Sequence, residues 1–207
     1  MKILFQGDSI TEWHRDVNDP DSIGDGYVAF AIDNLTKRFP NREFEFFNRG
    51  VSGDRTRELL KRWQKDTIDI QPDIMTLMIG VNDTWRRYDM NDPTPVEEYE
   101  QNLRALLDDV KANTNAKLLM IEPFLAHADN DLWREDFYEK VNAYRRVAKE
   151  YADAYLPMDG LYAMMCVEKE PTHWSQDGVH LVGPGNERMG YYVAQSLAAM
   201  IEAMEHV

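Results

Sequence analysis

The residue types most capable of catalysis are a serine near the start of the chain and an aspartate–histidine pair near its end. Ser9 lies in the segment QGDSIT at residues 6–11, directly after a short apolar run. Asp177 and His180 lie in the segment DGVH at residues 177–180. Nucleophilic acyl transfer needs an aspartate that orients an imidazole and an imidazole that deprotonates a serine hydroxyl. These three side chains therefore make the chain a candidate for that chemistry.

Each of these motifs also has a plain structural explanation when it is taken alone. A serine after an aspartate commonly caps a helix, and an acid–histidine pair commonly lies on the surface as a solvated pair. The two motifs gain weight together because both follow segments that are expected to end at one edge of a sheet. Ligands of open α/β proteins bind beyond the carboxyl ends of the strands.

A tetrahedral intermediate also requires hydrogen-bond donors for its oxyanion. Gly53 has no side chain, so its backbone N–H can approach a substrate closely. Asn82 follows the third expected strand and offers a side-chain amide. The structural alternatives are a glycine that only permits a positive φ and an asparagine that only stabilises its own turn.

The segments that must position these residues alternate between strand and helix patterns. Short apolar or alternating runs predict strands at residues 3–5, 43–47, 74–79, 117–121 and 154–158. Apolar residues at helical spacing predict helices at residues 27–39, 57–63, 96–110, 133–151, 161–167 and 186–204. Residues 80–95 and 172–185 are polar and are expected to form loops. This alternation predicts an α/β protein with a parallel, doubly wound sheet in one domain over residues 1–207.

The amino-acid composition limits the classes of molecule that the protein is expected to bind. The chain has 207 residues, with 37 acidic against 23 basic side chains and a formal charge of −14. So acidic a surface disfavours nucleic acids and anionic membranes and favours a neutral substrate. No apolar run is long enough to span a membrane and no secretory signal is recognisable, so a soluble, cytoplasmic protein is expected. The single cysteine excludes an intrachain disulfide.

Four motifs occur in an order that resembles the SGNH hydrolases, also called GDSL esterases and lipases. They are GDSIT at residues 7–11, GVSGD at 50–54, GVND at 80–83 and DGVH at 177–180. The resemblance extends from Ile3 to about Met189. Ile10 stands at the position of the leucine in the GDSL motif after which the family is named. It implies a flavodoxin-like three-layer α/β/α sandwich with a five-stranded parallel sheet. The segment MIGVNDTWRRYD at residues 78–89 and GYV at 26–28 further resemble the bacterial acetylxylan-esterase branch.

The resemblance implies a role for each site residue. Ser9 would be the nucleophile, His180 the general base and then acid, and Asp177 the orienting carboxylate. The oxyanion hole would consist of the Ser9 N–H, the Gly53 N–H and the Asn82 side chain. No metal or cofactor is implied. Members of the acetylxylan-esterase branch often assemble, which allows a homo-oligomer.

Aromatic side chains close to the four motifs suggest a substrate. Such rings can pack on the face of a sugar or enclose a small acyl pocket, although they are also ordinary core residues. The expected substrate is a short acyl group, most simply acetyl, on a carbohydrate alcohol, and no apolar segment resembles a lipase lid. The alternative is a lysophospholipase or thioesterase acting on longer acyl groups. The candidate substrate contacts are Asp8, Trp85, Tyr88 and Trp174, with Trp13 close by.

Two further classes of function are compatible with parts of the sequence. A metal-dependent phosphoester hydrolase could use the side chains of Asp8, Asp83, Asp177 and His180 as ligands, but Ser9 and Asn82 would then have no role. A noncatalytic carbohydrate- or partner-binding domain could use the same fold. No glycine-rich nucleotide-binding motif is present. The remaining histidines, which are His14, His127, His173 and His206, have no partner that the sequence reveals.

Overall fold

A five-stranded sheet forms the centre of the computed structural model, which describes residues 1–126 and 131–205. All four strand pairings are parallel, in the spatial order β2-β1-β3-β4-β5. The strands are β1 (Lys2–Gly7), β2 (Glu45–Asn48), β3 (Ile74–Met78), β4 (Lys117–Ile121) and β5 (Ala154–Leu156). The five predicted strands and the predicted α/β class are therefore confirmed.

The composition of the central strands follows from their position. Every residue of β3 is buried, and so are residues 3–7 of β1. A parallel strand that is covered on both faces needs an almost continuous apolar run rather than an alternating pattern. At the edge, β2 begins at Glu45, which pairs with Lys2, two residues later than the pattern predicted.

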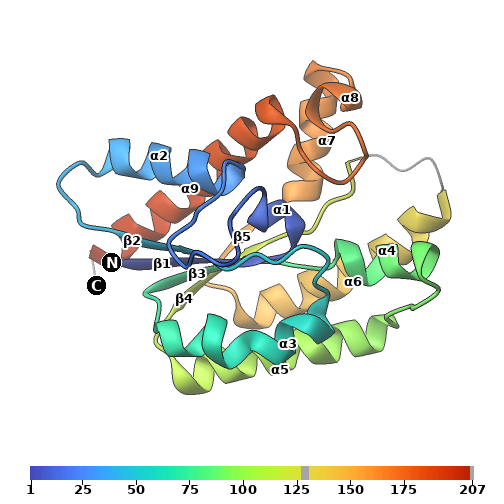
Figure 1. The fold of residues 1–207 in the computed structure, drawn as a ribbon, viewed down its shortest axis with the longest axis horizontal. Coiled ribbons are helices and arrows are strands. Elements are labelled where there is room, and N and C mark those ends of the chain that lie inside the picture. The colour runs from blue at the N-terminus through green and yellow to red at the C-terminus, as the bar shows by residue number, and fades with distance from the viewer. Residues whose placement is uncertain (127–130, 206–207) are drawn as a thin grey trace.

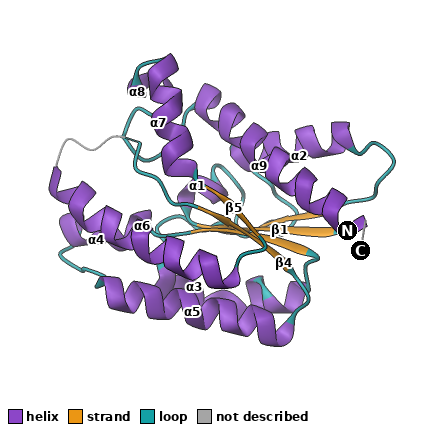
Figure 2. Cartoon of the chain, turned by 180° about the vertical axis from the view of Figure 1, so that it is seen from behind, coloured by secondary structure: helices purple, strands orange, loops and turns teal. Residues whose placement is uncertain are grey.

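Helices cover both faces of the sheet and make three layers (Figures 1 and 2). On one face lie α1 (Ser9–Glu12), α2 (Tyr27–Arg38), α7 (Met158–Glu168), α8 (Pro171–Trp174) and α9 (Gly183–Glu205). On the other face lie α3 (Thr56–Asp66), α4 (Val81–Asp89), α5 (Val96–Asn113) and α6 (Asp131–Tyr151), with the short 3-10 helix η1 (Ile68–Ile70). None of the helices within the described ranges combines the length and the apolar composition that crossing a membrane requires.

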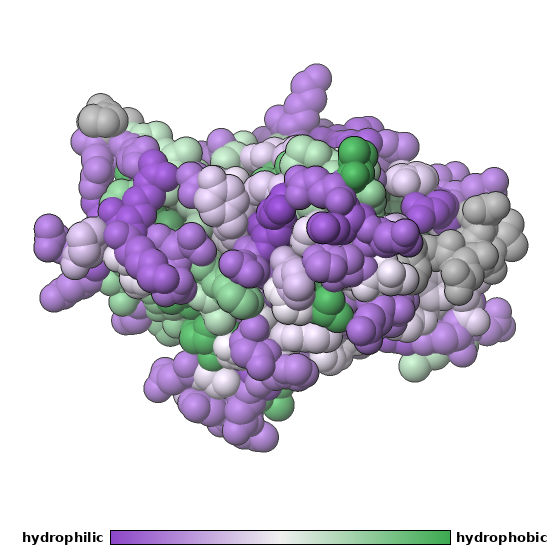
Figure 3. Space-filling view, turned by 90° about the horizontal axis from the view of Figure 1, so that it is seen from above, coloured by the Kyte–Doolittle hydropathy of each residue, from purple (hydrophilic) through white to green (hydrophobic). Residues whose placement is uncertain are grey.

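Hydrophilic side chains cover much of the face that Figure 3 shows, with smaller apolar areas between them. The large apolar side chains that are exposed are spread along the chain, from Val17 to Tyr191. Single exposed apolar residues of this kind are normal on a protein surface.

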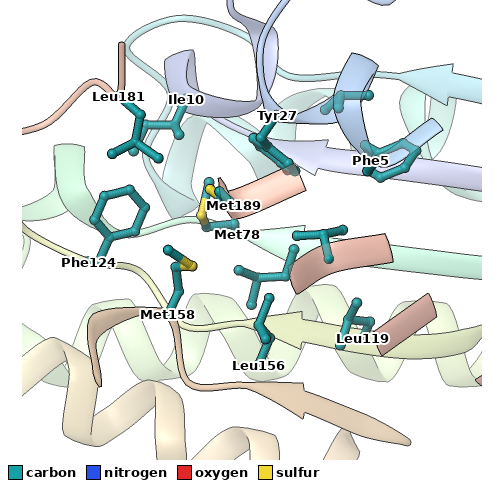
Figure 4. Close-up of a cluster of buried hydrophobic side chains, with 14 of the residues drawn as sticks. Phe5, Ile10, Tyr27, Met78, Leu119, Phe124, Leu156, Met158, Leu181 and Met189 are labelled. Atoms are coloured by element: carbon teal, nitrogen blue, oxygen red, sulfur yellow. The ribbon is translucent and has the colours of Figure 1, made fainter. Parts of the chain in front are cut away.

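The apolar interior forms two clusters, one on each side of the sheet. Helices α2, α7 and α9 contribute to the first cluster, in which Phe5, Tyr27, Met78 and Met189 meet (Figure 4). Helices α3, α5 and α6 contribute to the second, together with the opposite faces of β1, β3 and β4. Burial of these side chains is the main stabilising contribution, at about 25 cal/mol for each Å² of apolar surface.

The main difference from the predicted elements is a helix where a polar loop was expected. Residues 80–95 contain α4, whose buried residues are Val81, Asn82, Asp83 and Thr84. Because three of these four are polar, the apolar periodicity that normally reveals a helix is absent. The predicted loop at residues 172–185 likewise contains the end of α8 and the start of α9.

Candidate active site

Ser9 lies where the first strand passes into the first helix. Asp8 caps α1, since its Oδ1 accepts a hydrogen bond from the Ile10 N–H at 3.0 Å, and Ser9 is the first residue of that helix. A Cβ at Gly7 would lie 2.4 Å from Thr11 Oγ1 and 2.5 Å from the Met78 carbonyl oxygen. Only glycine allows this close turn. The local sequence thus places a partly exposed serine at the carboxyl end of β1 (Figure 1).

The histidine and the aspartate of the DGVH segment meet this serine. Ser9 Oγ lies 2.7 Å from His180 Nε2, although the two residues are 171 positions apart. On the other side of the ring, His180 Nδ1 lies 2.6 Å from Asp177 Oδ2. A carboxylate can only accept a hydrogen bond, so Nδ1 carries the proton and Nε2 of the neutral ring is free to accept one. The expectation that the distant ends of the chain converge is confirmed.

Hydrogen bonds to both oxygens fix the carboxylate of Asp177, including one from Ser175 Oγ to Oδ1 at 3.4 Å. Besides the imidazole on Oδ2, the backbone N–H groups of Val179 and His180 donate to Oδ1 at 2.9 and 2.7 Å. Partial desolvation opposes ionisation, but these hydrogen bonds outweigh it and hold the pKa of Asp177 below its usual value. Asp177 is therefore an anion at neutral pH and keeps the ring of His180 in one orientation.

Besides the Ser9 N–H, the two other expected oxyanion donors come from adjoining segments. Gly53 has a φ of +84°, and nothing but the Arg86 guanidinium lies within 4 Å of where its Cβ would be. Asn82 belongs to α4, and its Nδ2 donates to the Asp54 carbonyl oxygen at 3.1 Å. The loop that carries Gly53 packs on the serine segment, because the Val51 N–H donates to the Gly7 carbonyl oxygen at 3.2 Å.

Buried carboxyl groups surround the serine segment, and the sequence did not reveal them as a cluster. Burial is the largest cause that raises the pKa of Asp8 to about 7, with further contributions from Asp83 and Asp54. Burial likewise raises the pKa of Asp83 to about 7, against hydrogen bonds from the N–H and Oγ1 of Thr56. No group of three or more metal-ligating side chains converges anywhere in residues 1–126 and 131–205.

Aromatic rings flank His180. Trp13 stacks on the imidazole with a centroid distance of 5.4 Å, and Trp85 lies tilted at 6.1 Å. Trp133, which the sequence suggested only as the start of a helix, extends this wall because it lies 5.7 Å from Trp85 and 5.1 Å from Tyr88. No spacing rule could have revealed Trp133, because α6 brings it to the site from a distant part of the chain.

The other candidate substrate contacts lie in different surroundings. Asp8 is 1% exposed, and Trp174 is 4% exposed with its Nε1 donating to the Met165 carbonyl oxygen at 3.0 Å. Burial leaves these two side chains almost no surface for a substrate, whereas contact by Trp85 and Tyr88 stays a prediction. Trp174 borders a separate cavity of about 660 Å³ beside α9.

Two of the remaining histidines do have partners. The His14 Nδ1 lies 2.8 Å from Asp25 Oδ1, and its ring stacks on Trp13 at 4.9 Å. The ring of His173 packs edge-on against Trp174 at 4.6 Å. His127 and His206 lie outside the described residues.

Comparisons with known proteins identify the family of the chain. The model of the GDSL-like lipase/acylhydrolase family matches residues 5–188. An acetylxylan esterase of Geobacillus stearothermophilus is 29% identical over 187 residues, which are 86% of this chain and 85% of that protein. The alignment therefore spans almost the full length of both proteins.

Solved structures share the fold of this chain. A Parabacteroides merdae protein described as a GDSL-like lipase superposes with a TM-score of 0.90 and 32% identity over 94% of each chain. An acetylxylan esterase of Geobacillus stearothermophilus superposes with a TM-score of 0.83 and 27% identity over 95% of this chain and 91% of its own. Catalytic mutants of that esterase, with a serine, a histidine or an aspartate replaced by alanine, match as well. The chain belongs to the GDSL-like lipase/acylhydrolase family and is a carboxylic ester hydrolase.

Proposed function

We propose that the chain is a serine esterase that hydrolyses short-chain acyl esters, in particular acetyl esters, of carbohydrates. The observation that carries this proposal is the contact of Ser9 Oγ with His180 Nε2 at 2.7 Å while Asp177 holds the other ring nitrogen. An alcohol, a base and an orienting carboxylate in this order are the parts that acyl transfer to serine requires.

The proposed reaction has two steps. Ser9 Oγ attacks the carbonyl carbon of the ester as His180 Nε2 takes its proton, and the N–H groups of Ser9 and Gly53 and the amide of Asn82 stabilise the oxyanion. The intermediate collapses, the C–O bond to the sugar breaks, and the imidazolium protonates the leaving alcohol. Water then attacks the acyl-enzyme with the same base, which releases the carboxylic acid and restores Ser9.

The surroundings of His180 support its change of charge during this cycle. The imidazolium that forms after each proton transfer faces the Asp177 carboxylate. The stacked ring of Trp13, at 5.4 Å, adds a cation–π attraction to the charged form of the ring.

Two observations support the substrate. The aromatic wall of Trp13, Trp85, Tyr88 and Trp133 offers flat apolar surface beside the nucleophile, which suits the face of a sugar ring. The relatives include acetylxylan esterases, and their mutated catalytic residues are of the types of Ser9, Asp177 and His180. In that enzyme the mutated aspartate and histidine are three positions apart, which is also the spacing of Asp177 and His180.

The test compares wild-type protein with Ser9→Ala on nitrophenyl acetate, butyrate and octanoate and on acetylated xylooligosaccharides. We expect acetate to be the fastest nitrophenyl ester, release of acetate from the oligosaccharides, and near-complete loss of both activities in Ser9→Ala. A fluorophosphonate probe should label Ser9, which a noncatalytic binding domain would not allow. Undiminished hydrolysis by Ser9→Ala would disprove the mechanism, and faster hydrolysis of octanoate would indicate a lysophospholipase-like enzyme instead.

A further inference from the structure

The amide of Asn82 is held at both of its ends. Its Nδ2 donates to the Asp54 carbonyl oxygen at 3.1 Å, and its Oδ1 accepts a hydrogen bond from Arg86 Nη2 at 3.1 Å. The side chain is 1% exposed, so water does not compete for these bonds. An amide nitrogen carries two protons, and only one of them is used by the carbonyl of Asp54.

These two partners together dictate which way the amide points. If the amide rotated by 180°, its NH₂ group would face the cationic guanidinium and its oxygen would face the carbonyl oxygen of Asp54. Both contacts would then be repulsive, and a buried donor left without an acceptor costs about 1–3 kcal/mol. The second N–H of Asn82 therefore has one fixed direction before any substrate binds.

Arg86 is itself anchored. It lies four residues after Asn82, on the same side of α4, where side chains at this spacing are neighbours. Its Nη1 donates to the carboxylate of Asp89, and its guanidinium lies 5.4 Å from the centre of the Trp85 ring. Its Nη2 also lies 3.9 Å from the position that a Cβ on Gly53 would take, so the guanidinium borders two of the three expected oxyanion donors, Gly53 and Asn82.

We propose that Arg86 is a positioning residue that orients and polarises the Asn82 amide for oxyanion stabilisation. This inference rests on the proposed function. A cationic donor on the amide oxygen draws electron density from the nitrogen, which makes the remaining N–H a stronger donor. The benefit grows as negative charge develops on the substrate oxygen, so it lowers the barrier of the chemical step more than it strengthens substrate binding.

The test is a double-mutant cycle on Asn82 and Arg86 with nitrophenyl acetate. Arg86→Met keeps the length of the side chain without the donor, and we expect kcat to fall roughly 10- to 100-fold, as for one hydrogen bond to a charged group, with KM nearly unchanged. Asn82→Ala should lower kcat on the order of 100- to 1000-fold. The double variant should be no slower than Asn82→Ala, because Arg86 acts only through the amide.

Arg87→Met is the matched control, because Arg87 is the next residue of α4, is exposed and pairs with Asp136 instead. Its kcat should stay that of the wild type. Thermal unfolding of each variant first gives a temperature at which all variants are folded. When kcat is compared at that temperature, a lower kcat reflects a loss of turnover and not a loss of folded protein.

Three results would overturn the role of Arg86. They are unchanged kcat in Arg86→Met, a change confined to KM, and losses that multiply in the double variant as though the two residues acted independently. The proposed function fails on different evidence, namely unchanged turnover in Ser9→Ala, whereas unchanged turnover in Asn82→Ala would overturn only the oxyanion role of Asn82 and with it that of Arg86. The two failures are therefore distinguishable in one set of measurements.

Discussion

At the scale of single residues, Asp177 determines which nitrogen of His180 can accept a proton. Both of its carboxylate oxygens accept hydrogen bonds, and the one to His180 keeps the proton of the neutral ring on Nδ1. We expect Asp177→Asn to lower kcat on the order of a thousandfold or more, since an amide can donate to Nδ1 and leave the proton on Nε2. KM should change little because Asp177 acts through the ring of His180, which it contacts at Nδ1. Steady-state kinetics on nitrophenyl acetate would measure both constants.

The chain contains a matched control for this substitution. Asp25 forms a similar pair with His14 at 2.8 Å, but both side chains are exposed and neither contacts Ser9. Asp25→Asn should therefore keep the turnover of the wild type. Equal losses in the two variants would contradict the role of Asp177.

Asp8 links the serine segment to the pH dependence of stability. Burial raises its pKa to about 7, so between about pH 4 and pH 7 the folded chain binds more protons at this position than the unfolded chain does. The stability that Asp8 contributes is therefore complete below its unfolded pKa and is lost as the pH rises through 7.

Asp8→Asn removes this dependence and keeps an oxygen that can cap α1. We would measure the free energy of unfolding of both proteins with denaturant at pH 5 and at pH 8. Relative to the wild type, the variant should be more stable at pH 8 than at pH 5 by roughly 2–4 kcal/mol, since one pKa unit corresponds to about 1.36 kcal/mol. A difference between the two proteins that does not vary with pH would show that Asp8 is not buried in this way.

At the scale of elements, α3 holds the segments that carry the nucleophile and the glycine donor. From that helix Arg62 donates to the Asp54 carboxylate at 2.6 Å, to the Arg49 carbonyl oxygen at 2.8 Å and to the Gly7 carbonyl oxygen at 3.1 Å. One side chain thus joins the ends of β1 and β2 to the loop of Gly53.

Arg62→Met should leave the buried carboxylate of Asp54 without its cation and cost about 3–5 kcal/mol of unfolding free energy. Turnover should fall as well, because the loops of Ser9 and Gly53 lose their common anchor. Urea unfolding would measure the first effect. Lys61→Met is the control, since Lys61 is 72% exposed and its loss should cost at most about 1 kcal/mol; an equal cost for both variants would refute the anchor.

The elements also show what the sequence could and could not predict. The strands were predictable because β3 and β4 are apolar runs, and α9 because Met189, Val193 and Leu197 recur at helical spacing. Helix α4 was not, because three of its four buried side chains are polar. Patterns of apolar residues along the sequence identify elements that bury apolar surface. They do not identify a helix whose inner face carries polar groups.

At the scale of the whole molecule, the two apolar clusters share the strands of one sheet, and we propose that the chain unfolds as one domain. Leu197 belongs to the cluster of α2, α7 and α9, and Leu106 to that of α3, α5 and α6. Leu197→Ala and Leu106→Ala should each destabilise by about 2–5 kcal/mol and lower the midpoint of a single thermal transition. Calorimetry that resolves two transitions, each sensitive to only one variant, would divide the chain into two units.

The long-range arrangement of the site was partly predictable. The alternation of strands and helices placed Ser9 and the DGVH segment at one edge of the sheet, and the structure brings Ser9 and His180 together. The contacts of Arg86 with Asn82 and of Trp133 with Tyr88 were not predictable, because side-chain direction depends on how helices pack. Order along the chain reveals which loops meet, but not which atoms touch.

The separation of 171 positions between the hydroxyl and the imidazole has a consequence for the life of the polypeptide. During synthesis Ser9 precedes His180, which follows β5, so the serine has no partner until all five strands have been synthesised. Ester cleavage by such a chain begins only when the last crossover is in place. The appearance of hydrolysis during refolding from urea would therefore report when the segment of His180 docks against Ser9. Spectroscopic probes of helix content would change before this step.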